Sequence, residues 1–334
     1  MRRALVLSIA TAMGGCGAGD HVSADAGALN VDAGVADSDR GHDAWTGQEA
    51  SIDAEAGRPS GTIDPRGGGG TVNRLAFTAF GDIRPALPDE DFAYPNATVK
   101  SIVGEMATLG PEFAVATGDY MFVEYIPSSA TGQLQALLDD EKTFTSPIFH
   151  AMGNHECQSF TDVNCPNLDE SVNITTYLSM LLPWTKVPWF SFIVHTDMGD
   201  AKFVFVAVNA WNDTQAQWLT QTMALQTRYT FIIRHHPTPD AGHPSSAEGI
   251  AGSDTILNNY PVTLLLFGHV HEYARLTPNR VITGNAGAPL DEGMYGYLYV
   301  EQRPDGNIQA TEHELGGAAP IDTFAVTPDG HATQ

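Results

Sequence analysis

The chain has 334 residues, and 43% of them are hydrophobic, so it can bury a sizeable core as one large domain or two small ones. Its formal net charge is −24, with 40 acidic against 16 basic residues, and this balance argues against a dedicated nucleic-acid-binding protein, which needs a basic surface. Small anionic substrates are compatible with such a chain if bound cations supply positive charge locally.

The N-terminus has the pattern of an export signal. Two arginines precede the apolar run 4–13, which is too short to span a membrane. Two glycines and Cys16 follow, and together they resemble a bacterial lipobox, in which the cysteine is lipidated and becomes the mature N-terminus. We therefore expect residues 1–16 to be a lipoprotein-type signal peptide, with a lipid at Cys16 as the only membrane contact. An ordinary secretory signal, which would leave a secreted protein, is the alternative.

Residues 17–70 have a different composition from the rest of the chain. They are rich in Ala, Gly, Asp and Ser, and they end in four consecutive glycines. Such a segment cannot bury enough apolar surface to order itself, so the composition predicts a disordered linker. This division places a folded domain at residues 71–325 and a short C-terminal tail at 326–334.

The chain has three cysteines, Cys16, Cys157 and Cys165. If Cys16 carries lipid, an even pair remains, and its two members lie close together in a polar loop. Because exported proteins retain disulfides, we expect Cys157 and Cys165 to be bonded to each other. Two free thiols or a metal clip are the alternatives, although the spacing suits no common zinc motif.

Within the domain, short apolar runs alternate with glycine-containing loops and helical patterns. Five runs are rich in Val, Ile, Leu and Phe, as buried strands are. They are residues 74–80, 112–117, 147–152, 229–234 and 262–267. Two further pairs of apolar runs indicate paired strands, 189–195 with 202–209 and 280–285 with 295–302.

Helical periodicity lies between several of these runs. Residues 97–110 place their apolar side chains on one helical face, and Asp213 is placed to cap a second helix over residues 214–228. Strands that alternate with helices form βαβ units. The pattern therefore predicts an α/β fold, a sandwich of mixed sheets with helices outside.

Polar residues directly follow each of the five buried runs. They are Asp82, Asp119, Asn154 with His155, His235, and His269 with His271. In open α/β sheets the carboxyl ends of the strands form the edge where ligands bind, so these residues can converge in space. Two divalent cations about 3.5–4 Å apart need such carboxylate, amide and imidazole donors to activate water and hold a phosphate. In this arrangement Asp119 bridges the ions, Asp82 and His271 hold the first, and Asn154, His235 and His269 hold the second.

Five segments, in this order, resemble the motifs of the calcineurin-like metallophosphoesterase superfamily. They are GDIR (81–84), GDYM (118–121), GNHE (153–156), RHHP (234–237) and GHVH (268–271). The resemblance covers residues 74–300 and implies a β-sandwich of two mixed sheets flanked by α-helices. It also implies phosphoester hydrolysis by a metal-bound hydroxide at a dinuclear site with the ligands given above. By the same resemblance Asn154 and His155 contact the substrate, and His155 assists the leaving group as a general acid or charge stabiliser.

One position departs from the family pattern. The first motif usually reads Asp-x-His, with that histidine on the first metal, but here the position is Arg84, whose guanidinium cannot ligate. The tyrosine found in purple acid phosphatases, which also lack the histidine, corresponds here to Phe122. Three roles are open for Arg84. It binds the substrate phosphate and takes part in catalysis, it replaces part of the first metal's charge, or it forms a structural salt bridge.

The other histidines leave some alternatives open. His235 and His236 compete as a ligand of the second ion, and we prefer His235 because it directly follows its strand. His236 and His243 lie near the site and could touch the substrate. His150, His195 and His313 are expected to be structural.

The sequence therefore favours an exported metallophosphoesterase that acts on a small phosphoester, with monoesters slightly preferred over diesters. Oxygen and imidazole donors suit two divalent or trivalent ions of Fe, Mn or Zn, and the first site is expected to be the weaker one. The alternative is a catalytically weak, surface-displayed binding protein with an impaired first metal site, and Arg84 is its main support.

Overall fold

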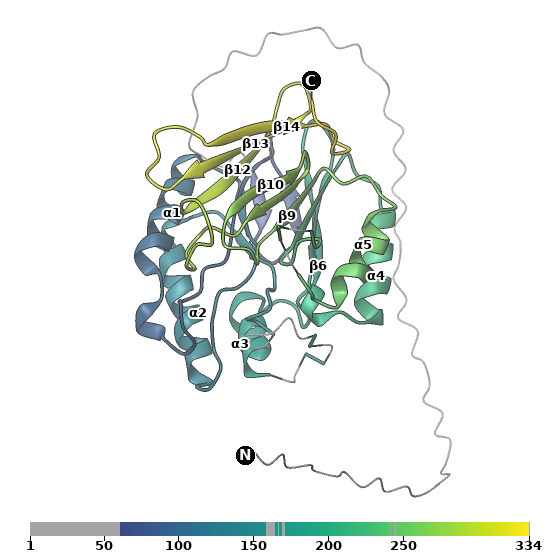
Figure 1. Ribbon diagram of the computed structural model, residues 1–334. Coiled ribbons are helices and arrows are strands. Elements are labelled where there is room, and N and C mark those ends of the chain that lie inside the picture. The colour runs from purple at the N-terminus through teal and green to yellow at the C-terminus, as the bar shows by residue number, and fades with distance from the viewer. Residues whose placement is uncertain are drawn as a thin grey trace, which may run out of the picture. The chain divides into compact units, whose positions relative to one another are not determined.

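The computed structural model describes residues 61–157, 164–165, 167–168, 171–240, 242–243 and 245–333. The predicted signal peptide, the lipidation site Cys16 and linker residues 17–60 lie outside the described residues. In the described part, two β-sheets pack face to face and helices cover their outer faces (Figure 1). The predicted fold class, an α/β sandwich of two mixed sheets, is confirmed.

Eight strands form the larger sheet. In spatial order they are β1 (Thr62–Asp64), β2 (Gly69–Thr71), β6 (Phe190–His195), β7 (Ala201–Val206), β8 (Tyr229–Arg234), β9 (Leu264–Phe267), β11 (Arg280–Thr283) and β10 (Tyr273–Thr277). Strands β7, β8, β9 and β11 run parallel to one another, whereas β6 and β7 form an antiparallel hairpin. The parallel arrangement brings the carboxyl ends of β8 and β9 to the same edge.

Six strands form the smaller sheet. In spatial order they are β14 (Asp322–Val326), β13 (Ile308–Glu314), β12 (Gly296–Gln302), β3 (Ala76–Phe80), β4 (Phe113–Ala116) and β5 (Ile148–His150). Strands β3, β4 and β5 are parallel, and β12 joins them antiparallel through β3. The carboxyl ends of the three parallel strands therefore also meet at one edge.

Aromatic side chains fill the space between the sheets. Phe77 and Phe113 project from the smaller sheet, and Phe203 and Phe231 project from the larger one. The Phe203 ring centroid lies 5.1 Å from that of Phe77 and 4.9 Å from that of Phe113, in edge-to-face contacts. Edge-to-face packing of buried rings stabilises the sandwich beyond the area it removes from water.

Within the described residues, five α-helices lie outside the sheets. They are α1 (Asn96–Thr108), α2 (Ser128–Asp140), α3 (Val172–Leu181), α4 (Asp213–Ala224) and α5 (Gly249–Leu257), with short 3-10 turns η1 (Asp91–Ala93), η2 (Glu141–Thr143) and η3 (Val208–Ala210). Helix α1 packs on β12, α2 lies between α1 and α3, and α4 and α5 cover the outer face of the larger sheet (Figure 1). None of the helices in the described residues combines the length and apolar character that crossing a bilayer requires.

The buried runs of the sequence are confirmed as strands β3, β4, β5, β8 and β9, four of them shorter than predicted. The predicted helix at 97–110 is α1. The predicted pairing of 189–195 with 202–209 is the hairpin of β6 and β7.

Two predictions at element boundaries are wrong. The linker does not extend to residue 70, because residues 62–71 form the hairpin of β1 and β2, and β2 pairs with β6. The tail does not begin at 326: Val326 ends β14, and the chain folds back so that Val326 pairs with Ala332. These segments are glycine-rich or short, but backbone pairing with a sheet edge orders them without a large apolar face.

Two pairing and capping predictions are also wrong. Strands β11 and β12 do not pair with each other; β11 joins the larger sheet and β12 joins the smaller one. The cap of α4 is Asn212, whose Oδ1 accepts the backbone N–H of Gln215 at 2.9 Å, and Asp213 is the first helical residue. Asn212 has the extended backbone that an N-cap requires.

Candidate metal centre at the strand ends

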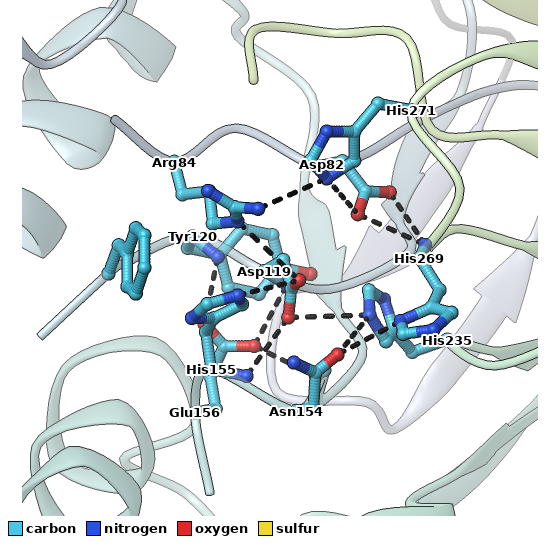
Figure 2. Close-up of polar contacts among 12 residues, drawn as sticks. Asp82, Arg84, Asp119, Tyr120, Asn154, His155, Glu156, His235, His269 and His271 are labelled. Atoms are coloured by element: carbon cyan, nitrogen blue, oxygen red, sulfur yellow. Dashed lines mark hydrogen bonds and ion pairs between the residues drawn. The ribbon is translucent and has the colours of Figure 1, made fainter. Parts of the chain in front are cut away.

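The polar residues that follow the buried strands converge where the two sheets meet. Asp82 and Asp119 follow β3 and β4, and Asn154 with His155 follows β5, all in the smaller sheet. His235 follows β8, and His269 with His271 follows β9, in the larger sheet. Figure 2 shows these side chains around Asp119, so the predicted set comes together from both sheets.

The backbone at the site is strained in a way that aims these side chains. Asp82, Asp119 and His269 have φ angles of 58°, 58° and 73°, in the left-handed region that L-residues rarely adopt. Such conformations cost about 1–3 kcal/mol each and persist when the surroundings impose them. Here the backbone N–H groups of Asp82 and Ile83 donate to the carbonyls of Gly118 and Asp119, which ties the ends of β3 and β4 together.

Glycine is required beside two of these residues. A Cβ atom on Gly118 would lie 2.6 Å from His235 Nδ1, and the φ of Gly118 is 116°. A Cβ atom on Gly268 would lie 2.4 Å from Asp82 Oδ2. The glycines thus let the backbone approach the site closely enough for the strand ends of the two sheets to share it.

Four donor atoms form one half of the site. Asn154 Oδ1 lies 3.0 Å from His235 Nε2 and 3.1 Å from His269 Nδ1. Asp119 Oδ1 lies 3.3 Å from the same His235 Nε2. This group of Asp119, Asn154, His235 and His269, which we call the histidine half, is the set predicted for the second ion.

The orientation of the His235 ring is set by its other nitrogen. Nδ1 lies 2.9 Å from the carbonyl oxygen of Thr117, to which its N–H donates, and Nε2 points into the site. Burial lowers the pKa of His235, but the Asp119 and Asp82 carboxylates outweigh burial and raise it to about 9. The site therefore favours positive charge at this position, whether a proton or a bound ion supplies it.

The other half of the site contains Arg84. His271 Nε2 lies 3.8 Å from Asp82 Oδ1 but only 3.5 Å from Arg84 Nη2. Arg84 Nε lies 3.9 Å from Asp119 Oδ2, and the guanidinium stacks 4.7 Å above the Phe122 ring. This group of Asp82, Arg84, Phe122 and His271, which we call the arginine half, brings together the two positions that depart from the family pattern.

Among the described residues, two three-donor clusters lie at the site, one within the histidine half and its neighbour His236 and one that spans both halves. In the part of the chain that the structure describes, Asp82, Asp119 and His235 offer donor atoms within 4.8 Å of one another, and so do His235, His236 and His269. His271 belongs to neither group. The donor atoms of the predicted first-ion set, Asp82, Asp119 and His271, therefore do not all lie within 4.8 Å of one another.

The two aspartates have different environments. Burial raises the pKa of Asp82, and the neighbouring Asp119 raises it further. Burial alone would also raise the pKa of Asp119, but His235 and His155 outweigh it and lower the pKa. Asp119 is thus the ionised carboxylate between the halves, as expected for a bridging residue.

His155 lies beside Asp119 at the boundary of the two halves. Its Nε2 is 3.7 Å from Asp119 Oδ2, and its ring contacts that of Phe122 edge-on at 4.5 Å. Burial lowers the pKa of His155 to about 3, so the imidazole is neutral in these surroundings. Nδ1 is buried and has no hydrogen-bond partner among the described residues.

Two buried carboxylates that sequence reasoning did not assign support the site from behind. Glu156 accepts the backbone N–H groups of Asp119, Tyr120 and Gly153 at 2.8–2.9 Å. Glu312, on β13, accepts from Asn285 Nδ2 at 2.9 Å. The loop after Asn285 donates to the Asp82 carbonyl through the N–H of Ala288. For Glu156, its position directly after the Asn154-His155 pair was a sequence signal that it belongs to the site. Glu312 has no such signal in the sequence.

The remaining histidines divide as follows. His236 packs against His269, with ring centroids 3.9 Å apart, so it lies at the site next to His235 rather than apart from it. His150 is buried in β5 with Nε2 2.9 Å from Glu141 Oε1. His195, His243 and His313 contact Asp200, Glu272 and Tyr297, respectively.

Cys157 and Cys165 form a disulfide, as predicted. Cys157 directly follows Glu156, and the N–H of Cys165 donates to the carbonyl of Asn209. The bond closes an eight-residue separation immediately after the third strand-end motif. Together, the disulfide and the hydrogen bond from Cys165 to Asn209 link the loop that carries Asn154 and His155 to the segment after β7.

The two-sheet sandwich and its strand-end cluster of carboxylate, amide and imidazole donors define a metallophosphoesterase. A sequence model described as calcineurin-like phosphoesterase matches residues 75–273. The chain therefore belongs to the calcineurin-like phosphoesterase family, whose members are phosphoric ester hydrolases. A search among curated proteins found no match.

Solved structures with a similar fold share little sequence with this chain. A purple acid phosphatase from yellow lupin (Lupinus luteus) seeds is 16% identical, with a TM-score of 0.56 over 77% of this chain and 54% of that chain. GAP50, described as the anchor in the inner membrane complex of Plasmodium, is 13% identical, with a TM-score of 0.55 over 77% and 89%. A dimetal phosphatase from Danio rerio is 12% identical, with a TM-score of 0.52 over 76% and 99%. These likenesses agree with the observed sandwich.

Proposed function

We propose that the protein is an exported phosphomonoesterase whose metal-dependent activity is centred on the histidine half of the site. Family membership supports metal-dependent hydrolysis of phosphoesters as the general reaction. The observation that carries the proposal is the convergence of donor atoms from Asp119, Asn154, His235 and His269. Oxygen and imidazole donors that face one point so closely are the ligands that Fe, Mn and Zn prefer in proteins.

The donor set fits a metal ion. Carboxylate and amide oxygens with imidazole nitrogens suit Fe, Mn or Zn, and the hydrogen bond from His235 to Thr117 is the outer support that metal-ligating histidines use. A bound ion would supply Lewis-acid stabilisation of phosphoryl charge and a lowered pKa for water. The protein's own residues then have to bind and orient the ester.

Arg84 and His155 are the residues placed to do this. Arg84 Nε is buried and makes no hydrogen bond with the described residues, so it is a donor available for a phosphoryl oxygen. His155 lies on the other side of Asp119 Oδ2, where a neutral imidazole N–H can donate to the departing oxygen. Both side chains are held in place by the ring of Phe122.

The preference for monoesters rests on charge. A monoester dianion presents three non-bridging oxygens, one more than a diester, and the fixed guanidinium of Arg84 offers a partner for the additional charge. Export rests on the N-terminal sequence pattern with Cys16, and a disulfide suits an oxidising compartment.

The test is hydrolysis of nitrophenyl phosphate and of bis(nitrophenyl) phosphate by the purified protein, with manganese added and with a chelator. We expect manganese-dependent hydrolysis of both esters, with kcat/KM about tenfold higher for the monoester. Activity unaffected by the chelator would contradict metal dependence, and a preference for the diester would contradict the monoester assignment. Palmitate labelling of the chain in a bacterial host, compared with Cys16→Ser, tests the lipid anchor.

A second candidate is a catalytically weak, surface-displayed binding protein. The position of Arg84 beside His271 favours it, because the arginine half lacks a ligand that the family pattern contains. The similar fold of GAP50, which is described as an anchor, is compatible with such a role. Inactivity toward a broad panel of phosphoesters, with metal bound, would support this candidate against the phosphatase.

A further inference from the structure

Arg84 lies among the side chains that the family pattern assigns to the first ion. Its Nη2 is 3.5 Å from His271 Nε2, and its Nε is 3.9 Å from Asp119 Oδ2. The same His271 Nε2 lies 3.8 Å from Asp82 Oδ1. The positive charge of Arg84 therefore occupies the region where the three predicted first-ion ligands would otherwise meet.

The guanidinium is held in this position from two sides. Arg84 Nη1 donates to the carbonyl of Pro85 at 3.1 Å, and the guanidinium plane lies on the Phe122 ring at 4.7 Å. Only 15% of the Arg84 side chain is exposed. A long cationic side chain in solvent would sample many rotamers, whereas this one is confined to the site.

His271 is oriented toward the arginine. Its Nδ1 donates to the carbonyl of Pro289 at 2.7 Å, so the lone pair of Nε2 faces Arg84 Nη2. A metal ion on that lone pair would be in contact with a guanidinium that cannot lose its proton. His271 is also outside both three-donor clusters of the described residues.

We propose that Arg84 takes the place of the first metal ion and that the centre binds one ion, in the histidine half. His271 then accepts a hydrogen bond from Arg84 instead of ligating metal. The guanidinium supplies the second positive charge toward the phosphoryl group, through the buried Nε that has no hydrogen bond with the described residues. This inference rests on the proposed phosphoesterase function and specifies how its site is built.

The first test is the number of ions that the full chain binds. The protein is saturated with Mn²⁺, desalted and analysed by elemental mass spectrometry. We expect one ion per chain for the wild type and for His271→Ala, and a fall to near zero for His269→Ala. Two ions in the wild type, or loss of the ion in His271→Ala, would overturn the proposal.

The matched variants His269→Ala and His271→Ala remove the same group two residues apart, so a general loss of folding would affect both. The Mn²⁺ electron paramagnetic resonance spectrum of the wild type gives a second measurement without any substitution. We expect the six-line spectrum of an isolated ion. A multiline spectrum from a coupled pair would overturn the proposal.

Arg84→His restores the family residue at the position in question. We expect it to bind two ions per chain, provided that thermal unfolding shows a folded protein, and an unchanged count of one would contradict the proposal. Arg84→Gln should keep one ion but bind inorganic phosphate at least about tenfold more weakly in calorimetry, because the charged donor is lost. Phosphate affinity equal to that of the wild type would also contradict it.

These outcomes are distinct from failure of the proposed function. A wild-type chain with one ion that hydrolyses no phosphoester would overturn the phosphatase assignment and leave the one-ion centre standing. A wild-type chain that binds two ions and hydrolyses monoesters would overturn the one-ion centre and leave the phosphatase assignment standing. A wild-type chain that binds no ion would overturn both.

Discussion

His269 and His271 lie two residues apart on one loop, yet their surroundings differ. His269 Nδ1 is 3.1 Å from Asn154 Oδ1, next to His235 and Asp119, and so faces other metal donors. His271 Nε2 is 3.5 Å from a guanidinium nitrogen, which is itself a cation. The comparison teaches that a complete motif does not make both of its histidines equivalent, because the residue opposite each one decides whether a cation can bind there.

The largest expected effect is on catalysis by the two histidine variants. His269→Ala should lower kcat/KM on the order of 10³-fold, which corresponds to about 4 kcal/mol of transition-state stabilisation, because the ion is lost. His271→Ala should lower it by about tenfold or less, because Arg84 keeps its other contacts. Steady-state kinetics with nitrophenyl phosphate compares the two, and equal losses would remove the distinction between the halves.

A second expected effect concerns Glu312, which supports the loop behind the arginine half, and the dependence of the free energy of unfolding on pH. Burial raises the pKa of Glu312 to about 8, whereas an unfolded glutamate titrates near 4.5. Because the folded state holds the proton more tightly, its stability falls as the pH rises from about 4.5 to about 8. Each unit of that difference corresponds to about 1.4 kcal/mol, so the loss amounts to a few kcal/mol.

Glu312→Gln should abolish most of this pH dependence, because glutamine stays neutral and still accepts from Asn285. Urea unfolding between pH 5 and 9, in the presence of a chelator, measures the free energy of unfolding without a contribution from metal. The control is Glu248→Gln at an exposed position, which should retain the wild-type slope. A Glu312→Gln profile parallel to that of the wild type would contradict the prediction.

His155→Ala tests the residue at the boundary of the halves. We expect kcat/KM to fall about 100-fold for an alkyl phosphate, because its poor leaving group needs a hydrogen-bond donor. For nitrophenyl phosphate, whose leaving group is good, the fall should be about tenfold. Equal losses with both esters would indicate that His155 contributes to binding rather than to departure of the leaving group.

The smallest expected effect concerns the support of the histidine half. In Glu156→Gln one of the two side-chain acceptors becomes an NH₂ group that faces backbone N–H donors, which costs about 1–3 kcal/mol. A domain of this size loses about 2–4 °C in Tm for each kcal/mol. Calorimetry of the metal-free protein checks this, and the exposed Glu248→Gln should leave Tm nearly unchanged. A Tm of Glu156→Gln equal to that of the wild type would show that Glu156 does not hold the Asp119 loop.

The strand ends could be predicted from sequence because their signal is local. A buried parallel strand is a continuous apolar run, so the residues that follow β3, β4, β5, β8 and β9 could be located by reading along the chain. Strands β13 and β14, with their mixed burial, carry a weaker pattern, and their ranges were not predicted. The pairing of β11 with β12 was wrong because the choice between two sheets depends on partners distant in sequence.

At the site, residue types were predictable and mutual orientations were not. Arg84 and Phe122 could each be recognised as a departure from the family pattern. Their contact, 4.7 Å between the guanidinium and the ring, joins positions on the segments after β3 and β4. Similarly, Glu156 was visible as a residue but its three backbone N–H bonds were not.

By itself, the sequence determined that carboxylates, an amide and imidazoles stand at the ends of buried strands, because period and composition are properties of neighbouring residues. It thereby determined the family and the class of reaction. Only the tertiary structure decided which donors face one another: Asn154 faces His235 and His269, whereas His271 faces Arg84. The reason is that distances of 3–4 Å between side chains from different strands depend on how two sheets pack, and no local pattern records that packing.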